Sequence, residues 1–294
     1  MIRFAGCLIS LLVALVALVT ATSADAALRY NRDTVQLPED AALPTLSPRP
    51  EQRFWDQMFR AQGVDPGSNK ARIVRAWIDR IGQDPLIASA IPGGANGIGR
   101  LFLDPQAREI VMTNGLVRLS ATDRLSYVAL MTKFLDELVP VNCFGLTSLS
   151  DVMARVTLRE MPEPDVAQYF ELLSKVLESD ALNRPVILPT GAQYASAQHH
   201  LSRALFVQLG GNTYDMSRFE NYVSNPSQAT PSDACWATRV TLHAILSMPD
   251  PDRDVVLLLT IMHSVDESVT PARGASSPIA PSPASTQPGR ARGH

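Results

Sequence analysis

The sequence predicts an all-α protein with a single compact domain of about eight to ten helices packed at mixed angles. Two observations predict this class. Apolar residues recur with the helical period of about 3.6 between residues 50 and 263, and the period-two alternation of strands is nearly absent. No signature repeats at a spacing of about 34 to 45 residues, so a solenoid is unsupported. An extended N-terminal leader and a disordered C-terminal tail are expected to flank the domain.

Turn and capping residues mark the helices in the first half of the domain. Gly63 ends the first helix, because glycine is common just after a helix C-terminus. Ser68 caps the second helix. Ser120 and Asp123 form a weak relative of the capping box, and they open the clearest helix of the chain. The helices predicted here cover residues 50–62, 68–82, 104–114 and 120–138.

Prolines mark two helix starts in the second half. Pro162 and Pro164 precede one helix and Pro251 precedes another, where proline suits the first turn. The apolar run from residue 255 to 259 leaves a buried strand as an alternative, although Pro251 and Asp252 favour a helix. The helices predicted here cover residues 149–160, 164–180, 190–209, 232–247 and 252–263.

The N-terminus has the layout of a secretory signal peptide. Arg3 supplies a positive charge, an uncharged apolar run follows from Phe4 to Val19, and small residues flank Asp25 at a peptidase site. We expect cleavage after Ala26. An uncleaved membrane anchor is the alternative, but the run is shorter than the roughly 20 residues that span a bilayer. The expected organisation is a signal peptide at 1–26, a leader at 27–49, a helical domain at 50–267 and a tail rich in Pro, Ser, Ala and Arg at 268–294.

The charge balance bears on the class of partner. The whole chain carries 26 basic and 29 acidic residues. The tail holds three of the arginines and no acid, so the helical domain is more acidic than the whole. A mildly acidic body argues against nucleic acid or an anionic membrane surface as the main partner. After signal cleavage, no segment is expected to span a membrane.

The cysteines predict one disulfide. Cys7 leaves with the signal peptide, so Cys143 and Cys235 remain in an oxidising compartment. In the chain-entropy model, a bridge over so long a loop contributes about 4–5 kcal/mol to stability. A catalytic thiol and a metal site are the alternatives, but neither cysteine has the CxxC or CxxH spacing.

The histidines are the main candidates for chemistry. His199 and His200 point about 100° apart on one helix and cannot share a metal, so we expect one to pack or cap and the other to be solvated. His243 is expected to be a hydrogen-bonded core or boundary residue. His263, Asp266 and Glu267 share a face of a continuing helix and are weak catalytic candidates. A polar C-terminal turn explains the same three residues.

Searches for other sites find no catalytic, metal or cofactor motif. The segment 92–99 is rich in glycine but lacks the GxGxxG and GxxxxGK[ST] spacings, so it is interpreted as a connector. GxSxG, SxxK and HExxH are also absent from the sequence. We therefore predict no cofactor and no metal. The absence of catalytic motifs favours a protein that is not an enzyme over one that is.

These observations support a hypothesis about function rather than a mechanism. The leading one is an exported, periplasmic or secreted, helical protein of the bacterial envelope that binds another protein, of an immunity or assembly-accessory type. A second is an envelope hydrolase that uses His263, Asp266 and Glu267 or the region of His199. A third is a structural protein whose tail contacts the cell wall. The sequence identifies neither the partner nor the oligomeric state.

Overall fold

The computed structural model describes residues 50–91 and 105–269, and these fold into helices without a strand in either range. The predicted all-α class is therefore confirmed. The predicted signal peptide, leader, glycine-rich segment and tail lie outside the described residues, apart from the end of the last helix. The helices are α2 (Pro50–Ala61), α3 (Asn69–Gln83), α4 (Pro85–Ala90), α6 (Pro105–Arg118), α7 (Ala121–Glu137), η3 (Cys143–Gly145), α8 (Leu149–Met153), α9 (Glu163–Leu182), α10 (Gly191–Gln208), α11 (Thr213–Ser224), η4 (Pro226–Gln228), α12 (Pro231–Leu246) and α13 (Asp252–Val269).

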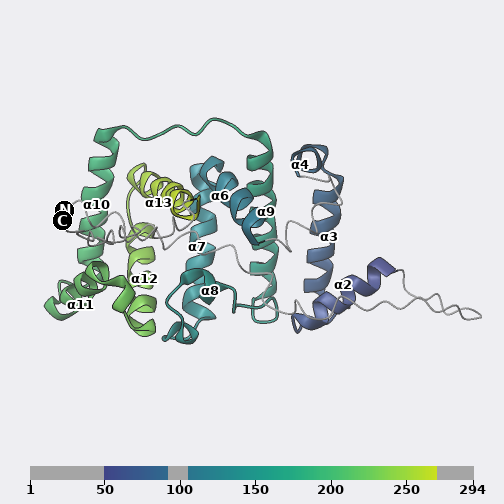
Figure 1. The fold of residues 1–294 in the computed structure, drawn as a ribbon, viewed down its shortest axis with the longest axis horizontal. Coiled ribbons are helices and arrows are strands. Elements are labelled where there is room, and N and C mark those ends of the chain that lie inside the picture. Colours follow the sequence, from purple (N-terminus) through teal and green to yellow (C-terminus); the bar gives the residue numbers. More distant parts are fainter. Residues whose placement is uncertain (1–49, 92–104, 270–294) are drawn as a thin grey trace, which may run out of the picture.

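Five helices form a row across the molecule (Figure 1). They lie in the order α3, α9, α7, α12 and α10, and each contacts the next. Two further helices cross this row: α6 packs on α9, and α13 packs on α10, α7, α12 and α6. Because neighbours in the row come from distant parts of the chain, the order of the helices in space differs from their order in the sequence.

The core lies between the row and the crossing helices. Its largest fully buried side chains include Phe59, Tyr127, Phe134 and Tyr169. The ring of Trp77 on α3 packs against Phe170 on α9 with 4.9 Å between centroids, and its Nε1 donates to Ser174 Oγ at 2.8 Å. A buried tryptophan that keeps its N–H satisfied adds apolar contact without an unpaired donor.

The predicted helix starts are confirmed where a hydroxyl caps them. Ser68 Oγ accepts from the N–H of Ala71, and Ser120 Oγ accepts from the N–H of Asp123. Thr190 and Gln193 complete a reciprocal capping box at the start of α10. Each cap satisfies one of the N–H groups that a helix leaves open in its first turn.

Three predicted helix limits were wrong. The helix predicted over 252–263 continues to Val269. The helix predicted over 149–160 ends at Met153, because the N–H and hydroxyl of Thr157 both donate to Glu160 Oε2 and hold a turn there. The helix predicted over 104–114 continues through Gly115 to Arg118. The prediction of the run from residue 255 to 259 as helix rather than strand is confirmed, since it lies within α13.

Two α-helices, α4 and α11, were not predicted from the sequence. The six residues of α4 are too few to display a helical period, and the helix depends on Asp84, whose side chain accepts from the N–H groups of Leu86 and Ile87. In α11 only Phe219 is buried, so there is no apolar stripe to recognise.

Helices α6 and α9 approach each other closely at Gly115. A Cβ atom on this residue would lie 2.2 Å from the carbonyl oxygen of Val176 on α9 and 2.6 Å from its Cγ1. Glycine inside a helix costs about 0.5–1 kcal/mol relative to alanine. Here the missing side chain lets the backbone of α6 pack directly against the backbone and side chain of Val176 on α9, which no other residue type allows.

An ion pair links two helices of the row. Lys175 Nζ on α9 donates to Asp123 Oδ1, in the first turn of α7, at 2.7 Å. This hydrogen bond, together with one from Ser120, lowers the pKa of Asp123, although partial burial opposes the shift. The same hydrogen bond raises the pKa of Lys175.

We expect Gly115→Ala to lower the free energy of unfolding by at least about 2 kcal/mol, because the added methyl group meets backbone that cannot move aside. Urea unfolding followed by circular dichroism measures the change. Gly82→Ala is the matched control: a Cβ there meets nothing within 4 Å, and alanine should stabilise α3 slightly. Equal stabilities for the two variants would contradict the close approach of α6 and α9.

We expect Asp123→Asn to lower the free energy of unfolding at pH 7 by about 0.5–1 kcal/mol. A lowered pKa adds stability above the unfolded-state value near 4, and this contribution disappears as the pH falls through the folded-state pKa. The wild type and the variant should therefore converge in urea unfolding at acidic pH, below the folded-state pKa of Asp123. Glu171→Gln, whose carboxylate lies 4.0 Å from Lys175 and is largely exposed, should have little effect at either pH.

Candidate functional site

The predicted disulfide between Cys143 and Cys235 is present. It joins η3 to α12, its Cα atoms are 5.6 Å apart, and both residues are buried. Cys143 and Phe144 have φ angles of 47° and 55°, a left-handed conformation that residues other than glycine rarely adopt. The bridge holds this short turn against the side of α12.

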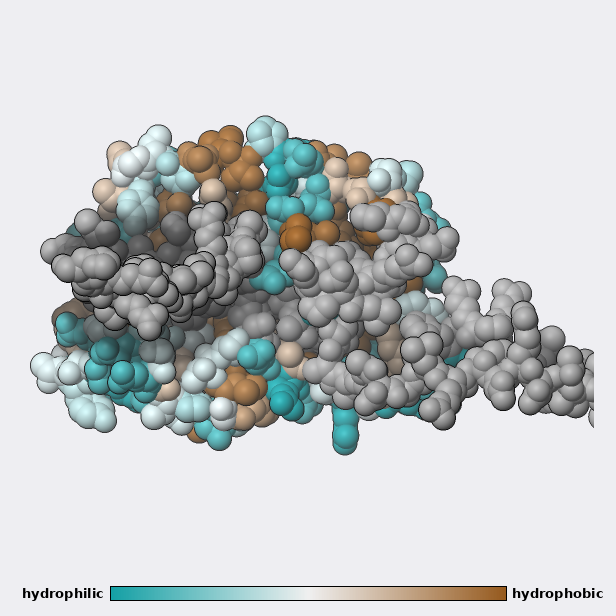
Figure 2. Space-filling model, viewed as in Figure 1, coloured by the Kyte–Doolittle hydropathy of each residue, from teal (hydrophilic) through white to brown (hydrophobic). Residues whose placement is uncertain are grey.

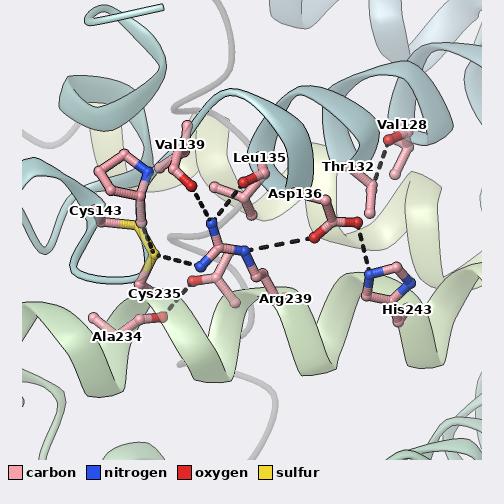
Figure 3. Close-up of polar contacts among 12 residues, drawn as sticks. Val128, Thr132, Leu135, Asp136, Val139, Cys143, Ala234, Cys235, Arg239 and His243 are labelled. Carbon is pink, nitrogen blue, oxygen red and sulfur yellow. Dashed lines mark hydrogen bonds and ion pairs between the residues drawn. A yellow bond between two sulfur atoms is a disulfide. The ribbon is translucent and has the colours of Figure 1, made fainter.

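A partly buried arginine connects the disulfide to the end of α7 (Figure 3). Arg239 on α12 donates through Nη2 to the carbonyl oxygens of Leu135 and Val139, at 2.6 and 2.7 Å. Its Nη1 donates to Cys235 Sγ at 3.1 Å. Burial lowers the pKa of Arg239, and the neighbouring Asp136 carboxylate opposes this shift. Arg239 thus satisfies carbonyls that α7 leaves open at its C-terminus.

Asp136 lies between Arg239 and His243 (Figure 3). Its Oδ1 is 3.5 Å from Arg239 Nε, and its Oδ2 is 2.9 Å from His243 Nε2. His243 is therefore a hydrogen-bonded boundary residue, as predicted. The three side chains bridge α7 and α12, and they form a structural connection rather than a set of groups converging on a substrate.

A second histidine cluster joins α10 to α13. His200 Nδ1 lies 2.6 Å from Asp252 Oδ2, and Ser196 Oγ donates to the same oxygen at 3.1 Å. His199 is exposed. The prediction that one of the two adjacent histidines packs and the other is solvated is confirmed.

The His200 cluster has two of the parts of a hydrolytic site. A carboxylate on Nδ1 orients an imidazole so that Nε2 can act as a base. The serine, however, donates to Asp252 and not to the histidine. Ser196 is thus not aligned as a nucleophile. Within the described ranges, no serine hydroxyl has a hydrogen bond to His199 or His200.

The weak catalytic candidates remain a prediction. His263, Asp266 and Glu267 all lie within α13, so their backbone is helical and their spacing places them on one face. Their side chains lie outside the described part of the structure. Among the side chains that are described, no group of three or more His, Cys, Asp or Glu residues could hold a metal ion.

Exposed hydrophobic side chains gather along one stretch of the chain. Of the large hydrophobic residues exposed in the described ranges, only Ile110, Val141 and Phe144 lie outside residues 182–216. Figure 2 shows hydrophobic surface at the upper edge, where the connection between α9 and α10 crosses in Figure 1. The members of this stretch are Leu182, Ile187, Leu188, Tyr194, Phe206, Val207, Tyr214 and Met216.

No protein-family model, curated protein or solved structure matches this chain. The helices in the described residues are too short or too polar to cross a membrane. Assignment of function therefore depends on the surface and on the clusters described above.

Sequence reasoning missed the interhelical clusters. His200 and Asp252 are 52 positions apart, and Arg239 is about 100 positions from the carbonyls that it satisfies. No spacing rule connects such residues. The one available signal was an arginine within an apolar helix, because a buried guanidinium must find several acceptors.

We expect Arg239→Met to lower the free energy of unfolding by about 2 kcal/mol, because it leaves two buried carbonyls at the end of α7 without a donor. Urea unfolding of the oxidised protein at pH 7 measures the change. His243→Ala removes only the half-exposed member of the same cluster and should cost no more than about 0.5 kcal/mol. A loss for Arg239→Met no larger than that of the histidine variant would contradict the capping role.

Proposed function

We propose that this chain is an exported protein of the bacterial envelope that binds another protein through the turn between α10 and α11. The single observation that carries the proposal is the exposure of four large side chains around that turn. They form what we call the α10–α11 patch, defined as Phe206, Val207, Tyr214 and Met216.

The geometry of the turn supports this assignment. Gly210 and Gly211 have φ angles of 62° and 63°, and these left-handed residues let the chain reverse within two positions after α10. The ring of Phe206 lies against Gly211, with its Cζ 3.5 Å from the place of a Cβ atom. The ring is thereby supported on one side while about half of its surface stays exposed.

The exposed fractions of the patch side chains also support a binding role for this turn. Val207 is 67 % exposed and Tyr214 is 72 % exposed, although aromatic and aliphatic side chains of this size are usually covered. Single exposed hydrophobic residues need no explanation, but four large ones on the two sides of one turn favour a surface that contacts a partner. Tyrosine and phenylalanine are also enriched where protein interfaces are buried most deeply.

Two further features favour an exported location. The N-terminal sequence has the layout of a signal peptide, and a disulfide is stable in oxidising compartments outside the cytoplasm. The acidic balance of the helical domain favours a protein partner over nucleic acid. The His200 and Asp136 clusters are occupied by contacts between helices, which leaves the patch as the best-supported site of action.

We expect the double variant Phe206→Ser/Val207→Ser to lose a partner that the wild type retains. The mature protein would be immobilised, exposed to cross-linked envelope extract of its host, washed, and analysed by mass spectrometry. Replacing the apolar side chains removes the buried area that would drive association, and a loss of at least tenfold in retained partner is expected.

Val141→Ser is the matched control, because this residue is 80 % exposed but lies outside the patch. Its capture profile should equal that of the wild type, and thermal unfolding should be the same for all three proteins. If the double variant and the control retain the same proteins in the same amounts, the proposed function is wrong.

A further inference from the structure

The connection between α9 and α10 is the longest described stretch that contains neither helix nor turn. It covers residues 184–190 and runs along the upper edge of the molecule from α9 to α10, at the far end of the row (Figure 1). Pro185 and Pro189 lie near its two ends. Each proline restricts the residue before it to extended conformations, so Arg184 and Leu188 are extended as well.

The middle of this connection is open to solvent. Ile187 is 88 % exposed and Leu188 is 62 % exposed, whereas Val186 packs against the core. The peptide groups of these three residues have no hydrogen-bond partner within the described ranges. Their N–H and C=O groups are therefore available to another molecule.

Both ends of the connection are fixed. Arg118 on α6 donates through Nε to the carbonyl oxygen of Arg184, at 3.0 Å, and through Nη2 to Asn183 Oδ1, at 2.7 Å. At the other end, the N–H of Thr190 donates to Gln193 Oε1 at 2.8 Å within the capping box of α10. The segment is thus held extended and displayed, and α10 keeps its own cap independently of the connection.

An extended, unpaired and exposed backbone is what an endopeptidase requires of its substrate. Proteins that bind extended peptides pair with the backbone as an added strand and place single side chains in pockets. A helix must first unfold to be bound in this way, at a cost in free energy that this connection avoids. Exposed backbone without internal hydrogen bonds is accordingly the preferred place of proteolytic nicking.

We propose that the connection is a proteolytic processing site, cleaved at Val186–Ile187 or Ile187–Leu188 by an endopeptidase with a pocket for an aliphatic side chain. The bonds that end at Pro185 and Pro189 are excluded, because proline lacks the N–H that an endopeptidase pairs with when it binds an extended chain. Water supplies the hydroxyl for the new carboxylate, the C–N bond breaks, and the nitrogen becomes a new amino terminus.

The disulfide determines what cleavage at this site produces. Cys143 precedes the connection and Cys235 follows it, so one cut yields two chains that remain covalently linked. Contacts of α13 with α6 and of α12 with α7 also cross the cut. The product is a folded, two-chain protein rather than a degradation intermediate.

The first test treats the folded mature protein briefly with thermolysin, which cleaves before bulky aliphatic residues. Mass spectrometry without reductant should show that residues 50–269 stay linked and gain one water, and reduction should release two pieces divided before Ile187 or Leu188. The circular dichroism spectrum should not change. An earlier cut elsewhere within residues 50–269, or unfolding after the cut, would overturn the proposal.

Two variants make the test specific. The double variant Ile187→Pro/Leu188→Pro removes the N–H at both named bonds and should reduce the cleavage rate at least tenfold, whereas Ile187→Val should be cleaved like the wild type. The Phe206→Ser/Val207→Ser variant should also be cleaved normally. The processing site and the proposed binding function can therefore fail separately.

The second test applies the same mass analysis to protein purified from the exported fraction of its own host. The expected result is one mass without reductant and two after reduction, divided at one of the two named bonds. A single, uncut chain after reduction would refute processing at this site.

Discussion

The contact between Gly115 and Val176 is the constraint on which the rest of the helical arrangement depends. It brings α6 against α9 at a distance that a side chain would prevent. α9 also contacts α3, α4 and α7, and α6 also contacts α13. The spacing of this one pair therefore fixes where both the row of helices and the crossing layer can lie. Close-packed interiors transmit such a displacement rather than absorb it.

Helices packed this closely leave carbonyl groups at their buried C-termini that water cannot reach, and arginines from other helices satisfy them. Arg124 on α7 donates to the carbonyls of Leu116, Val117 and Leu119 at the end of α6 and also pairs with Asp254. Arg239 on α12 likewise donates to the carbonyls of Leu135 and Val139 at the end of α7. A cation at a helix C-terminus also complements the helix dipole. These two guanidinium groups explain how the C-termini of α6 and α7 can end against the core with their carbonyl groups satisfied.

The sequence predicted the helical class, the disulfide and most of the helices, because each of these depends on local signals. Period, caps and cysteine count are readable from neighbouring residues. Gly115 illustrates the limit: by local signals a glycine weakens a helix, and only the position of α9 makes it necessary. The pairing of His200 with Asp252 likewise depends on how α10 meets α13. Contacts that tertiary packing creates have no counterpart in sequence spacing.

The α10–α11 patch is held more rigidly than an exposed turn would be by itself. Arg218 on α11 donates through Nε to Asp233 Oδ1 at 2.7 Å, and its guanidinium lies 4.2 Å from the centre of the Trp236 ring. Phe219 packs edge-on against the same ring. These contacts fix α11 to α12, so the patch does not have to be ordered when a partner arrives. Preorganised surfaces lose less conformational entropy on association. A modest apolar area can then give useful affinity, which is the physical argument for the proposal that a partner binds at this corner.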